Sequence, residues 1–471
     1  MTATVHLPTH ETAGDAVRRS ATLDRTRRRE FGRDRRSEIP LESHAAVPTD
    51  RADPIAALTA QDANRLADLV PIRHGRMSVS AFTFYRGAAA VMASDLSRVP
   101  SSGLWVELCG DAHLSNFGLF NGPDRRLVFD LNDFDETLPG PFEWDVKRLA
   151  ASVVVAARDN GIEPAKGRRA ALAAVAAYRQ AMSRAADADP LQLHYFRVEI
   201  DDLRQRLKAE QRRRTEAVVT KARSKDSMRA LAKLTTVVDG RLQFVDDPPL
   251  ITRLGSLDSH QAHDVDAFFE GYLRTLPLAR RRVVERYSIV DVARKVVGVG
   301  SVGTRCLIVL CQTADGEPLM LQFKEAGPSV LEPYLGSSGF SSAGERVVQG
   351  QRLMQAAGDV FLGWSTLESE VAGRPVDFYF RQLWDGKGSV PIEQMRGRGL
   401  RIYADVCGRT LALAHARTGD AAAIEGYVGD DATFDNSIAD FAEAYADLTA
   451  TDHLQHLAAI DAGDIVAIRD I

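Results

Sequence analysis

Hydrophobic and polar positions along the chain separate helical regions from strand-like ones. Apolar residues recur at helical spacing from about residue 55 to 98 and again, with many alanines, from Trp144 to about residue 234. Between about 288 and 327, runs rich in valine, isoleucine and leucine are separated by turn residues, which predicts three consecutive antiparallel strands. A helix at 341–358, two strands between 360 and 384, and helices to the C-terminus are expected to follow. The pattern predicts a mixed α+β protein.

Two polar segments follow apolar strands in the first third of the chain. An apolar run that begins at Trp105 leads into the loop GDAHLSNFG, residues 110–118. The turn NGPD then connects to a second apolar strand, which ends in FDLNDFDE, residues 129–136. A hairpin would bring the second segment back beside the first. Carboxylates held close together repel one another unless a cation is bound, so the sequence predicts a metal site here.

These segments contain the side chains that phosphoryl transfer needs. A carboxylate near the attacking hydroxyl can accept its proton, and further oxygen ligands hold magnesium against the nucleotide phosphates. Asp111 could accept the proton, and Asn116, at the far end of the same loop, could bind the metal. The other candidate metal ligands are Asp130, Asp133 and Asp135. Isolated aspartates usually only cap turns, but two clusters on either side of a tight turn favour the metal interpretation.

A glycine-rich segment, GVGSVG, lies nearly two hundred residues later and contains Gly298, Gly300 and Gly303. A dinucleotide-binding glycine motif runs into a helix, whereas the strand-like sequence TRCLIVLC follows here. We therefore expect a flexible hairpin that covers nucleotide phosphates, and not a Rossmann fold.

Lys324 lies on the third predicted strand, in LQFKEA, where kinases place the lysine that pairs with the α and β phosphates. A lysine on a strand is usually a solvated edge residue, but the preceding glycine loop favours a position facing a cleft. The kinase scheme also needs a helical acid to orient this lysine, for which Glu345 is the candidate and Glu325 the alternative. The stretch 376–388 would be the connector against which adenine stacks.

Composition and charge exclude few classes of protein or partner. The chain has 471 residues, of which 45% are hydrophobic and 26% charged, and its net charge of -5 points to no particular partner. The arginine-dense stretch from Arg25 to Arg36 is interpreted as a solvated tail and the basic run at 211–215 as a solvated helix face, so no nucleic-acid binding is predicted. No apolar stretch is long enough to span a bilayer and the first residues lack the plan of a signal peptide, so we expect a cytoplasmic protein without membrane contact.

The cysteines predict neither a disulfide framework nor a structural zinc site. They are scattered without a CxxC pair, at Cys109, Cys306, Cys311 and Cys407. Cys306 and Cys311 have opposite strand parity, so they are expected on opposite faces of a sheet as core residues.

The polar segments resemble motifs of known phosphotransferases. WVELCGDAHLSNFG is similar to the HGDxxxxN catalytic loop of aminoglycoside and choline kinases, and NDFDE is similar to their metal-binding IDF motif. By that resemblance Asp111 is the catalytic base, and Asn116 and Asp133 are magnesium ligands, with Asp130 and Asp135 as rivals to Asp133.

Three further residues enter through the same resemblance. GPFEWDVKRLAAS is similar to the helix that follows in those enzymes, with Asp145 at the characteristic position. His113 has the position of a loop histidine that could contact phosphate or substrate, or be merely structural. Cys109 replaces the usual loop histidine, so the loop must be braced differently here.

The order of the motifs differs from that of ordinary kinases, in which the glycine loop and lysine precede the catalytic loop. The region before Asp111 reads as helix and cannot easily supply a sheet. We therefore expect a protein-kinase-like bilobal fold that is circularly permuted, with a small antiparallel sheet lobe and a large helical lobe. LALAHART then resembles the helix that leads into the catalytic loop.

A larger set of motifs resembles domain of unknown function 2252, a bacterial family without an assigned substrate, over roughly residues 35 to 465. These motifs are FYRGAA near Arg86, GDAHLSNFG, NDFDE, FKEA, RQLWDGKG and LALAHARTGD.

The expected organisation is a polar basic tail at 1–50, a helical lobe with the catalytic loop and metal-binding hairpin at 51–285, a β-rich nucleotide-binding lobe at 286–390, and helices packing on the helical lobe at 391–471. The predicted function is phosphotransfer from ATP, with Mg²⁺, to an unidentified hydroxyl acceptor; the oligomeric state is left open. The alternatives are a non-catalytic nucleotide-binding regulator and a metal-dependent phosphoesterase, which GDxH suggests although the other histidine motifs of such enzymes are missing.

Overall fold

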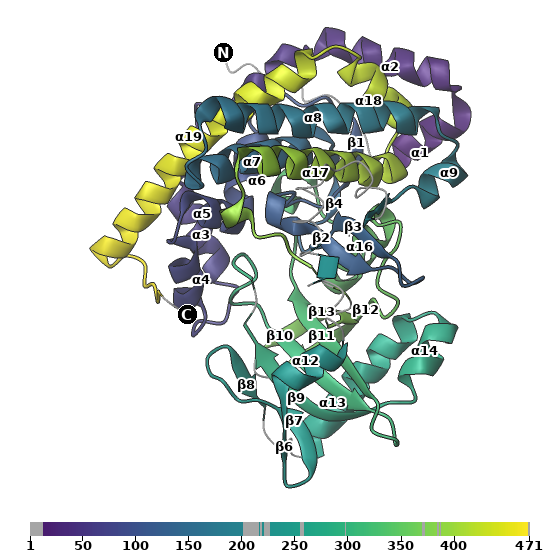
Figure 1. Cartoon of the computed structure of the whole chain (residues 1–471), viewed down its shortest axis with the longest axis vertical. Coiled ribbons are helices and arrows are strands. Elements are labelled where there is room, and N and C mark those ends of the chain that lie inside the picture. The colour runs from purple at the N-terminus through teal and green to yellow at the C-terminus, as the bar shows by residue number, and fades with distance from the viewer. Residues whose placement is uncertain are drawn as a thin grey trace.

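A six-stranded antiparallel sheet forms one end of the molecule (Figure 1). The computed structural model describes residues 13–200, 227–254, 259–296, 298–369, 373–383 and 388–469, together with residues 216, 219, 220 and 386. In spatial order the strands are β12 (Gly363–Ser369), β13 (Arg374–Gln382), β11 (Pro318–Ala326), β10 (Cys306–Gln312), β9 (Ser288–Lys295) and β8 (Ile251–Arg253). The predicted succession of three antiparallel strands is confirmed by β9, β10 and β11.

Side chains alternate between the two faces of β11, and different elements cover each face. Phe323 packs with α13 (Ser259–Thr275) and the end of α14 (Leu278–Val284) in an apolar cluster that also contains Cys311. Met320, on the opposite face, packs with the end of α12 (Ser227–Leu234) and with the hairpin of β6 (Thr235–Val238) and β7 (Arg241–Phe244). Cys306 lies on this second face, where its Sγ accepts a hydrogen bond from Gln322. The prediction that Cys306 and Cys311 face opposite sides is confirmed, and all four cysteines are buried and free.

The sheet end takes more of the chain than the sequence suggested. The elements from α12 to α14 pack around the sheet, whereas the sequence had placed residues up to 285 in the helical lobe. The physical reason is that both faces of the sheet are apolar and must be covered. Amphipathic helices next to it in the chain supply the cover, and their periodicity does not tell which layer they join.

Long helices form the other end of the molecule (Figure 1). They are α7 (Glu143–Asp159), α8 (Pro164–Asp187), α17 (Gly397–Thr418) and α19 (Thr433–Ala462), with the short α18 (Ala421–Val428) between the last two. The backbones of α8 and α17 approach so closely that a Cβ atom on Gly408 would lie 1.9 Å from the carbonyl oxygen of Ala174, so only glycine fits there. With helices and antiparallel sheets in one chain, the mixed α+β class is confirmed.

The arginine-dense N-terminal stretch is not a solvated tail from residue 13 onward. It forms α1 (Ala13–Thr22) and α2 (Arg25–Glu38), followed by η1 (Leu41–Ala45). Arg28 binds Asp420 at 3.2 Å, and Arg36 donates hydrogen bonds to the backbone carbonyls of Gly426 and Tyr427. These partners lie nearly four hundred residues away in the chain, which is why the local composition did not reveal them. The basic run at 211–215 lies outside the described residues.

The two polar segments of the first third lie on short strands between the lobes. β1 (Trp105–Leu108) pairs with β4 (Leu138–Pro141), and the hairpin of β2 (Phe117–Asn121) and β3 (Leu127–Leu131) is extended by β5 (Val198–Glu199). The short helix η2 (Leu114–Asn116) closes the loop before β2. The predicted return of the acidic segment beside the GDAHLSNFG loop is confirmed, since the backbone N–H of Asn132 donates to the carbonyl of Asn116.

Four short helices before β1 lie beside the junction of the two ends (Figure 1), and confirm the helical prediction for residues 55–98. They are α3 (Pro54–Asp62), α4 (Val70–Met77), α5 (Ala81–Gly87) and α6 (Ala89–Leu96). The remaining short elements are α9 (Pro190–Tyr195), α15 (Glu332–Leu335), α16 (Ala343–Met354) and η3 (Ile392–Gln394). Across the described ranges, no helix combines the length and the apolar character needed to cross a bilayer.

Candidate functional site

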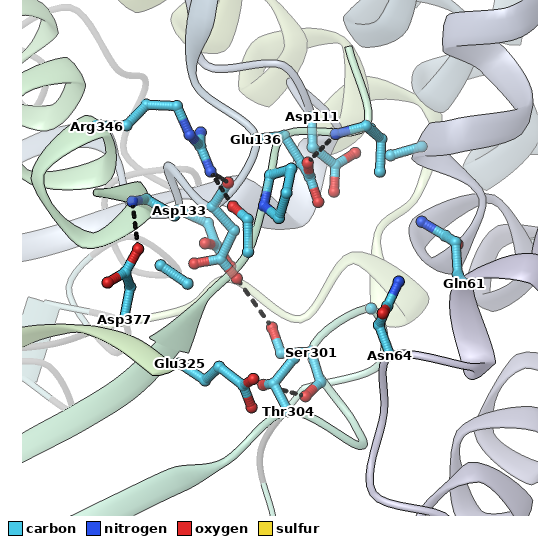
Figure 2. A pocket seen from close by; sticks show the side chains of 18 of the residues that line it. Gln61, Asn64, Asp111, Asp133, Glu136, Ser301, Thr304, Glu325, Arg346 and Asp377 are labelled. Carbon is cyan, nitrogen blue, oxygen red and sulfur yellow. Dashed lines mark hydrogen bonds between the residues drawn. The ribbon is translucent and has the colours of Figure 1, made fainter. Parts of the chain in front are cut away.

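A cavity of about 740 Å³ lies where the two ends of the molecule meet. Figure 2 shows Asp111 and Glu136 on one side of it and Ser301 and Thr304 of the glycine loop opposite them. The predicted residues that line the cavity are Asp111, His113, Asn116, Asp133, Asp135, Gly298 and Gly300. Segments that are almost two hundred positions apart in the chain therefore share one space.

The loop that carries Asp111 is braced by Asp145 and His415. Asp145, in the first turn of α7, accepts hydrogen bonds from the backbone N–H groups of Cys109 and Gly110 at 2.8 and 3.1 Å. His415 of α17 lies 3.2 Å from the same carboxylate through Nε2, and its Nδ1 is held by the hydroxyl of Tyr178. The expected different bracing of this loop is thus present: a histidine from the far end of the chain contacts the supporting carboxylate.

Asp111 is held by a buried arginine. Nε and Nη2 of Arg148, on α7, contact Oδ1 of Asp111 at 2.8 and 2.7 Å. Burial raises the pKa of Asp111 above its usual value, although the guanidinium of Arg148 opposes the shift. The carboxylate is therefore fixed in place with one oxygen committed to Arg148 and the other, Oδ2, directed elsewhere.

That second oxygen lies 3.5 Å from Nε2 of His113. Nδ1 of His113 accepts a hydrogen bond from the backbone N–H of Ser115, which places the ring hydrogen on Nε2, toward Asp111. Burial, together with the charges of Arg86 and Arg148, holds the pKa of His113 well below its usual value, so the ring is neutral at pH 7. The loop presents a carboxylate beside a neutral imidazole donor.

The amide of Asn116 is oriented by its own loop. Its Nδ2 donates to the backbone carbonyl of Asp111 at 2.8 Å, so Oδ1 is the atom left to act as an acceptor or metal ligand. Asn116 lines the cavity together with Asp133 and Asp135, which follow β3. Oxygen ligands of this kind suit magnesium, which typically takes one or two protein carboxylates and completes its shell with phosphates and water. Within the described ranges, no group of three or more histidine, cysteine, aspartate or glutamate side chains could hold a metal ion, so any ion here would depend on Asn116, phosphates and water for its other ligands.

Lys324 is the link between the sheet and these carboxylates. It is only 2% exposed, forms an ion pair with Asp135, and lies 3.8 Å from Asp133. The hydroxyl of Tyr379, its neighbour on β13, donates to Asp135 at 2.8 Å, and Ser301 of the glycine loop lies 3.4 Å from the same carboxylate. Burial opposes the charge of Lys324, yet the carboxylates of Asp133 and Asp135 raise its pKa overall. Lys324 contacts two carboxylates that line the cavity but is not itself among the lining residues, so the expectation that it faces a cleft stays a prediction.

Glu345 does not orient this lysine. Glu345 lies in the first turn of α16, and its carboxylate accepts a hydrogen bond from the hydroxyl of Ser341, which precedes the helix. The next residue, Arg346, points inward instead and donates to the carbonyls of Asp135, Thr137 and Gly327. One residue along a helix is a rotation of about 100°, so neighbouring positions cannot both face the cavity.

The alternative, Glu325, is likewise occupied elsewhere. It accepts hydrogen bonds from the backbone and the guanidinium of Arg305 at 2.9 to 3.2 Å. The partner that holds Lys324 in this structure is Asp135, from the acidic segment and not from a helix. The predicted connector is described only in part, since residues 384, 385 and 387 lie outside the described ranges.

Asp130 is not part of the cavity. It lies on β3, is buried, and accepts a hydrogen bond from the backbone N–H of Leu131. Burial raises the pKa of Asp130 to about 6, with Arg417 of α17 opposing the shift. The candidate metal ligands therefore reduce to Asp133 and Asp135, because these two follow the strand while Asp130 is still inside it.

The glycine loop is not a free flap. Val299 inserts into an apolar cluster with Phe84 of α5, and Val302 inserts into another with Ile72 of α4. The carbonyls of the loop are also held from outside: that of Gly298 by Arg76, that of Val302 by Arg65, and that of Gly303 by the N–H of Leu66. The expected flexible hairpin is instead clamped by the helices before β1.

Several cavity residues were missed by the analysis of the sequence. Glu136 and Arg346 stand beside Asp133 in Figure 2. Gln61, in the last turn of α3, and Asn64, in the turn that follows α3, reach the cavity from the region before β1. Arg86 lines it from α5. For Arg86 the FYRGAA motif was a usable signal; the others carried no local pattern that distinguishes them from solvated helix or turn residues.

The carboxyl group of Glu107, next to this site, should make the stability of the folded protein depend on pH. This buried residue of β1 accepts a hydrogen bond from Thr137, and burial raises its pKa to about 7, above the unfolded value of 4.5. The folded state thus binds the proton of Glu107 more tightly than the unfolded state does. The contribution of Glu107 to the free energy of unfolding is therefore fully present below pH 4.5 and is lost as the pH rises through 7. Glutamine does not titrate, so Glu107→Gln should not lose this stability as the pH rises. The difference in free energy of unfolding between Glu107→Gln and wild type should therefore shift in favour of the variant by up to about 3 kcal/mol between pH 5 and 8.

Urea denaturation at several pH values measures this difference. The matched control is Glu163→Gln, at an exposed position before α8, whose difference from wild type should stay flat from pH 5.5 to 8. A flat profile for Glu107→Gln as well would contradict the assignment of a buried, protonated carboxyl.

Comparison with known proteins identifies the family. A family model described as "Uncharacterized protein conserved in bacteria (DUF2252)" matches residues 65–459. This range contains the loop of Asp111, the acidic segment, the glycine loop and Lys324. No curated protein and no solved structure matches the chain. Because the family model covers most of its length, the chain belongs to the DUF2252 family of bacterial proteins.

Proposed function

We propose that this protein transfers a phosphoryl group from ATP, with the help of Mg²⁺, to a hydroxyl acceptor. The observation that carries the proposal is the ion pair of Lys324 with Asp135, which joins residues 189 positions apart. Lys324 is buried beside Asp133 and Asp135, two carboxylates that line the cavity, and Ser301 of the glycine-bearing loop lies by the second of them. A lysine, two carboxylates and a glycine loop held together in this way would suit nucleotide phosphates and a cation.

The sheet supports the proposal through the order of its parts. The glycine loop connects β9 and β10, Lys324 lies on the next strand, β11, and α16 follows. Protein kinases use a glycine-rich loop, then a lysine on the third strand, then a helix. The catalytic loop and metal ligands come earlier in this chain, so the proposed fold is kinase-like with a circularly permuted order.

Each residue has a role that follows from its contacts. Asp111, fixed by Arg148, would accept the proton of the attacking hydroxyl. Lys324 would exchange its contact with Asp135 for phosphate oxygens. Asn116, Asp133 and Asp135 fit a magnesium ion, and such an ion would neutralise charge on the phosphates. The acceptor would enter beside Gln61 and Asn64, since these polar side chains line the cavity near the loop of Asp111.

Calorimetry with ATP, with and without Mg²⁺, tests the proposal. We expect Mg²⁺-dependent binding by the wild-type protein and a loss of affinity of about 10²-fold or more for Lys324→Met and Asp133→Asn, because each removes a charge from the phosphate and metal site. The matched control is Lys166→Met, at an exposed lysine on α8 whose ion-pair partner is Glu163; this variant should bind as wild type does.

The outcomes separate the competing functions. Binding without turnover of any acceptor, including water and the protein itself, would indicate a nucleotide-binding regulator. Cleavage of phosphate esters without nucleotide binding would indicate a phosphoesterase. Absence of ATP binding at millimolar concentration would refute the proposal.

A further inference from the structure

We propose that Arg86, on α5, contacts the phosphoryl group during its transfer and stabilises the charge that develops there. The inference rests on the proposed function and extends it, because it assigns a catalytic residue to the helices that precede β1. Those helices would then be part of the active site as well as a clamp on the glycine loop.

The backbone of Arg86 touches the glycine loop. A Cβ atom built on Gly300 would lie 3.2 Å from the carbonyl oxygen of Arg86, and both residues line the cavity. The carboxylates that act on the guanidinium are those of Glu393, which has the largest effect, and of Asp111 and Asp133. Arg86 therefore lines the cavity next to the glycine loop, together with the proposed base and the proposed metal ligand, where the transferred group would lie.

Two buried arginines fix the backbone on both sides of Arg86. Nη2 of Arg148 donates to the carbonyl of Tyr85 at 2.7 Å, and Nη2 of Arg73 donates to the carbonyl of Gly87 at 3.1 Å. Arg148 is also the residue that holds Asp111. One guanidinium thus positions both the proposed base and the backbone segment that carries Arg86.

The side chain of Arg86 has no assigned protein acceptor. Within the described ranges it makes no hydrogen bond and no ion pair, and its Nε is buried without a partner. The other guanidiniums that line the cavity have partners: Arg65 and Arg346 donate to backbone carbonyls through their terminal nitrogens, and Arg374 pairs with Glu325. The Nε of Arg346 is buried without a hydrogen-bond partner, as that of Arg86 is, so the difference lies in the terminal nitrogens. Buried N–H groups without acceptors are costly, and a phosphoryl group offers the planar fork of arginine several oxygens at once.

The transfer step balances without a further reactant. The bond between the γ phosphorus and the bridging oxygen of ADP breaks, the acceptor oxygen forms the new bond to phosphorus, and the acceptor proton moves to Asp111. Arg86 remains protonated throughout and donates hydrogen bonds to the oxygens of the transferred group. Its contribution is therefore to the transition state and not to the binding of ADP.

Binding of ADP with Mg²⁺, measured by calorimetry with and without aluminium fluoride, isolates this contribution, because aluminium fluoride occupies the place of the transferred group. We expect Arg86→Gln to bind ADP within about threefold of wild type and to lose about 10²-fold or more of the added affinity that aluminium fluoride provides. Arg86→Lys should retain part of it, since the charge stays while the fork is lost. The control Arg169→Gln, at an exposed position on α8, should match wild type.

The results discriminate the inference from the function on which it rests. Unchanged affinity of Arg86→Gln for ADP with aluminium fluoride would overturn the role of Arg86 and leave the proposed function intact. Loss of ADP binding itself, with an unchanged melting temperature, would also overturn it, since Arg86 would then hold the ground-state nucleotide. A wild-type protein that binds neither ADP nor ATP would refute the proposed function, and the inference with it.

Discussion

Replacement of Asp111 by asparagine is expected to slow ADP formation from Mg²⁺·ATP by about 10³-fold, the range in which a positioned general base contributes. The carboxylate faces the cavity with one oxygen held by Arg148, and asparagine keeps the size of the side chain but cannot take up a proton. Because Asp111 is not among the residues that would hold the nucleotide, the affinity for Mg²⁺·ATP should remain within about threefold of wild type.

Rates of ADP release at saturating ATP, together with calorimetric affinities, measure the two effects separately. Asp124→Asn, in the exposed turn between β2 and β3, is the matched control and should leave both unchanged. A variant Asp111→Asn that turns over ATP within threefold of wild type would exclude Asp111 as the base. Equal loss of affinity and rate would instead indicate that the loop has been displaced.

Replacement of Arg148 by methionine is expected to lower the free energy of unfolding by about 3–5 kcal/mol, because it leaves a buried carboxylate without its counter-charge. Arg148 is 3% exposed, binds Asp111, and stacks on the ring of Tyr85 at 4.0 Å. An effect of this size is a large part of the stability of a typical protein.

Urea denaturation provides the measurement, and the same helix provides the control. Arg158 of α7 pairs with Asp447 at 2.8 Å, but both side chains are largely exposed, so Arg158→Met should cost less than about 1 kcal/mol. The double variant Arg148→Met with Asp111→Asn should lose less than the sum of the single variants, since no uncompensated charge remains. Additive losses would show that the two residues do not interact energetically.

The helices before β1 give the molecule a feature that the motifs did not indicate. They hold the glycine loop through Val299 and Val302 and border the cavity through Gln61 and Asn64. Their apolar residues read as an ordinary helical region in the sequence. The clusters they complete are formed with a loop more than two hundred residues away, so their partner could be identified only in three dimensions.

Local patterns predicted the parts of the site that lie within a few residues of one another. The NGPD turn returns the acidic segment beside the loop of Asp111, as expected from hairpin geometry. Strand alternation correctly predicted that Cys306 and Cys311 lie on opposite faces of the sheet. It did not decide whether Lys324 faces a cleft or solvent. The wrong assignments concern which of several neighbouring residues faces the site: Asp130 was grouped with Asp133 and Asp135, and Glu345 was chosen as the acid that orients Lys324 although Arg346, the next residue, is the one that points inward. A shift of one to three positions along a helix or strand changes the face on which a side chain lies. Which face points into the site depends on how that helix or strand packs in the fold.

The sequence by itself determined the mixed α+β class, the three consecutive strands and the acidic hairpin, because these follow from periodicity and turn residues. The tertiary structure decided which distant partners meet: Lys324 with Asp135, His415 with Asp145, Arg148 with Asp111, and the glycine loop with the helices before β1. Such pairings depend on how amphipathic elements stack to cover apolar surface. That free energy is shared over the whole core, and it leaves no mark in any short stretch of the chain.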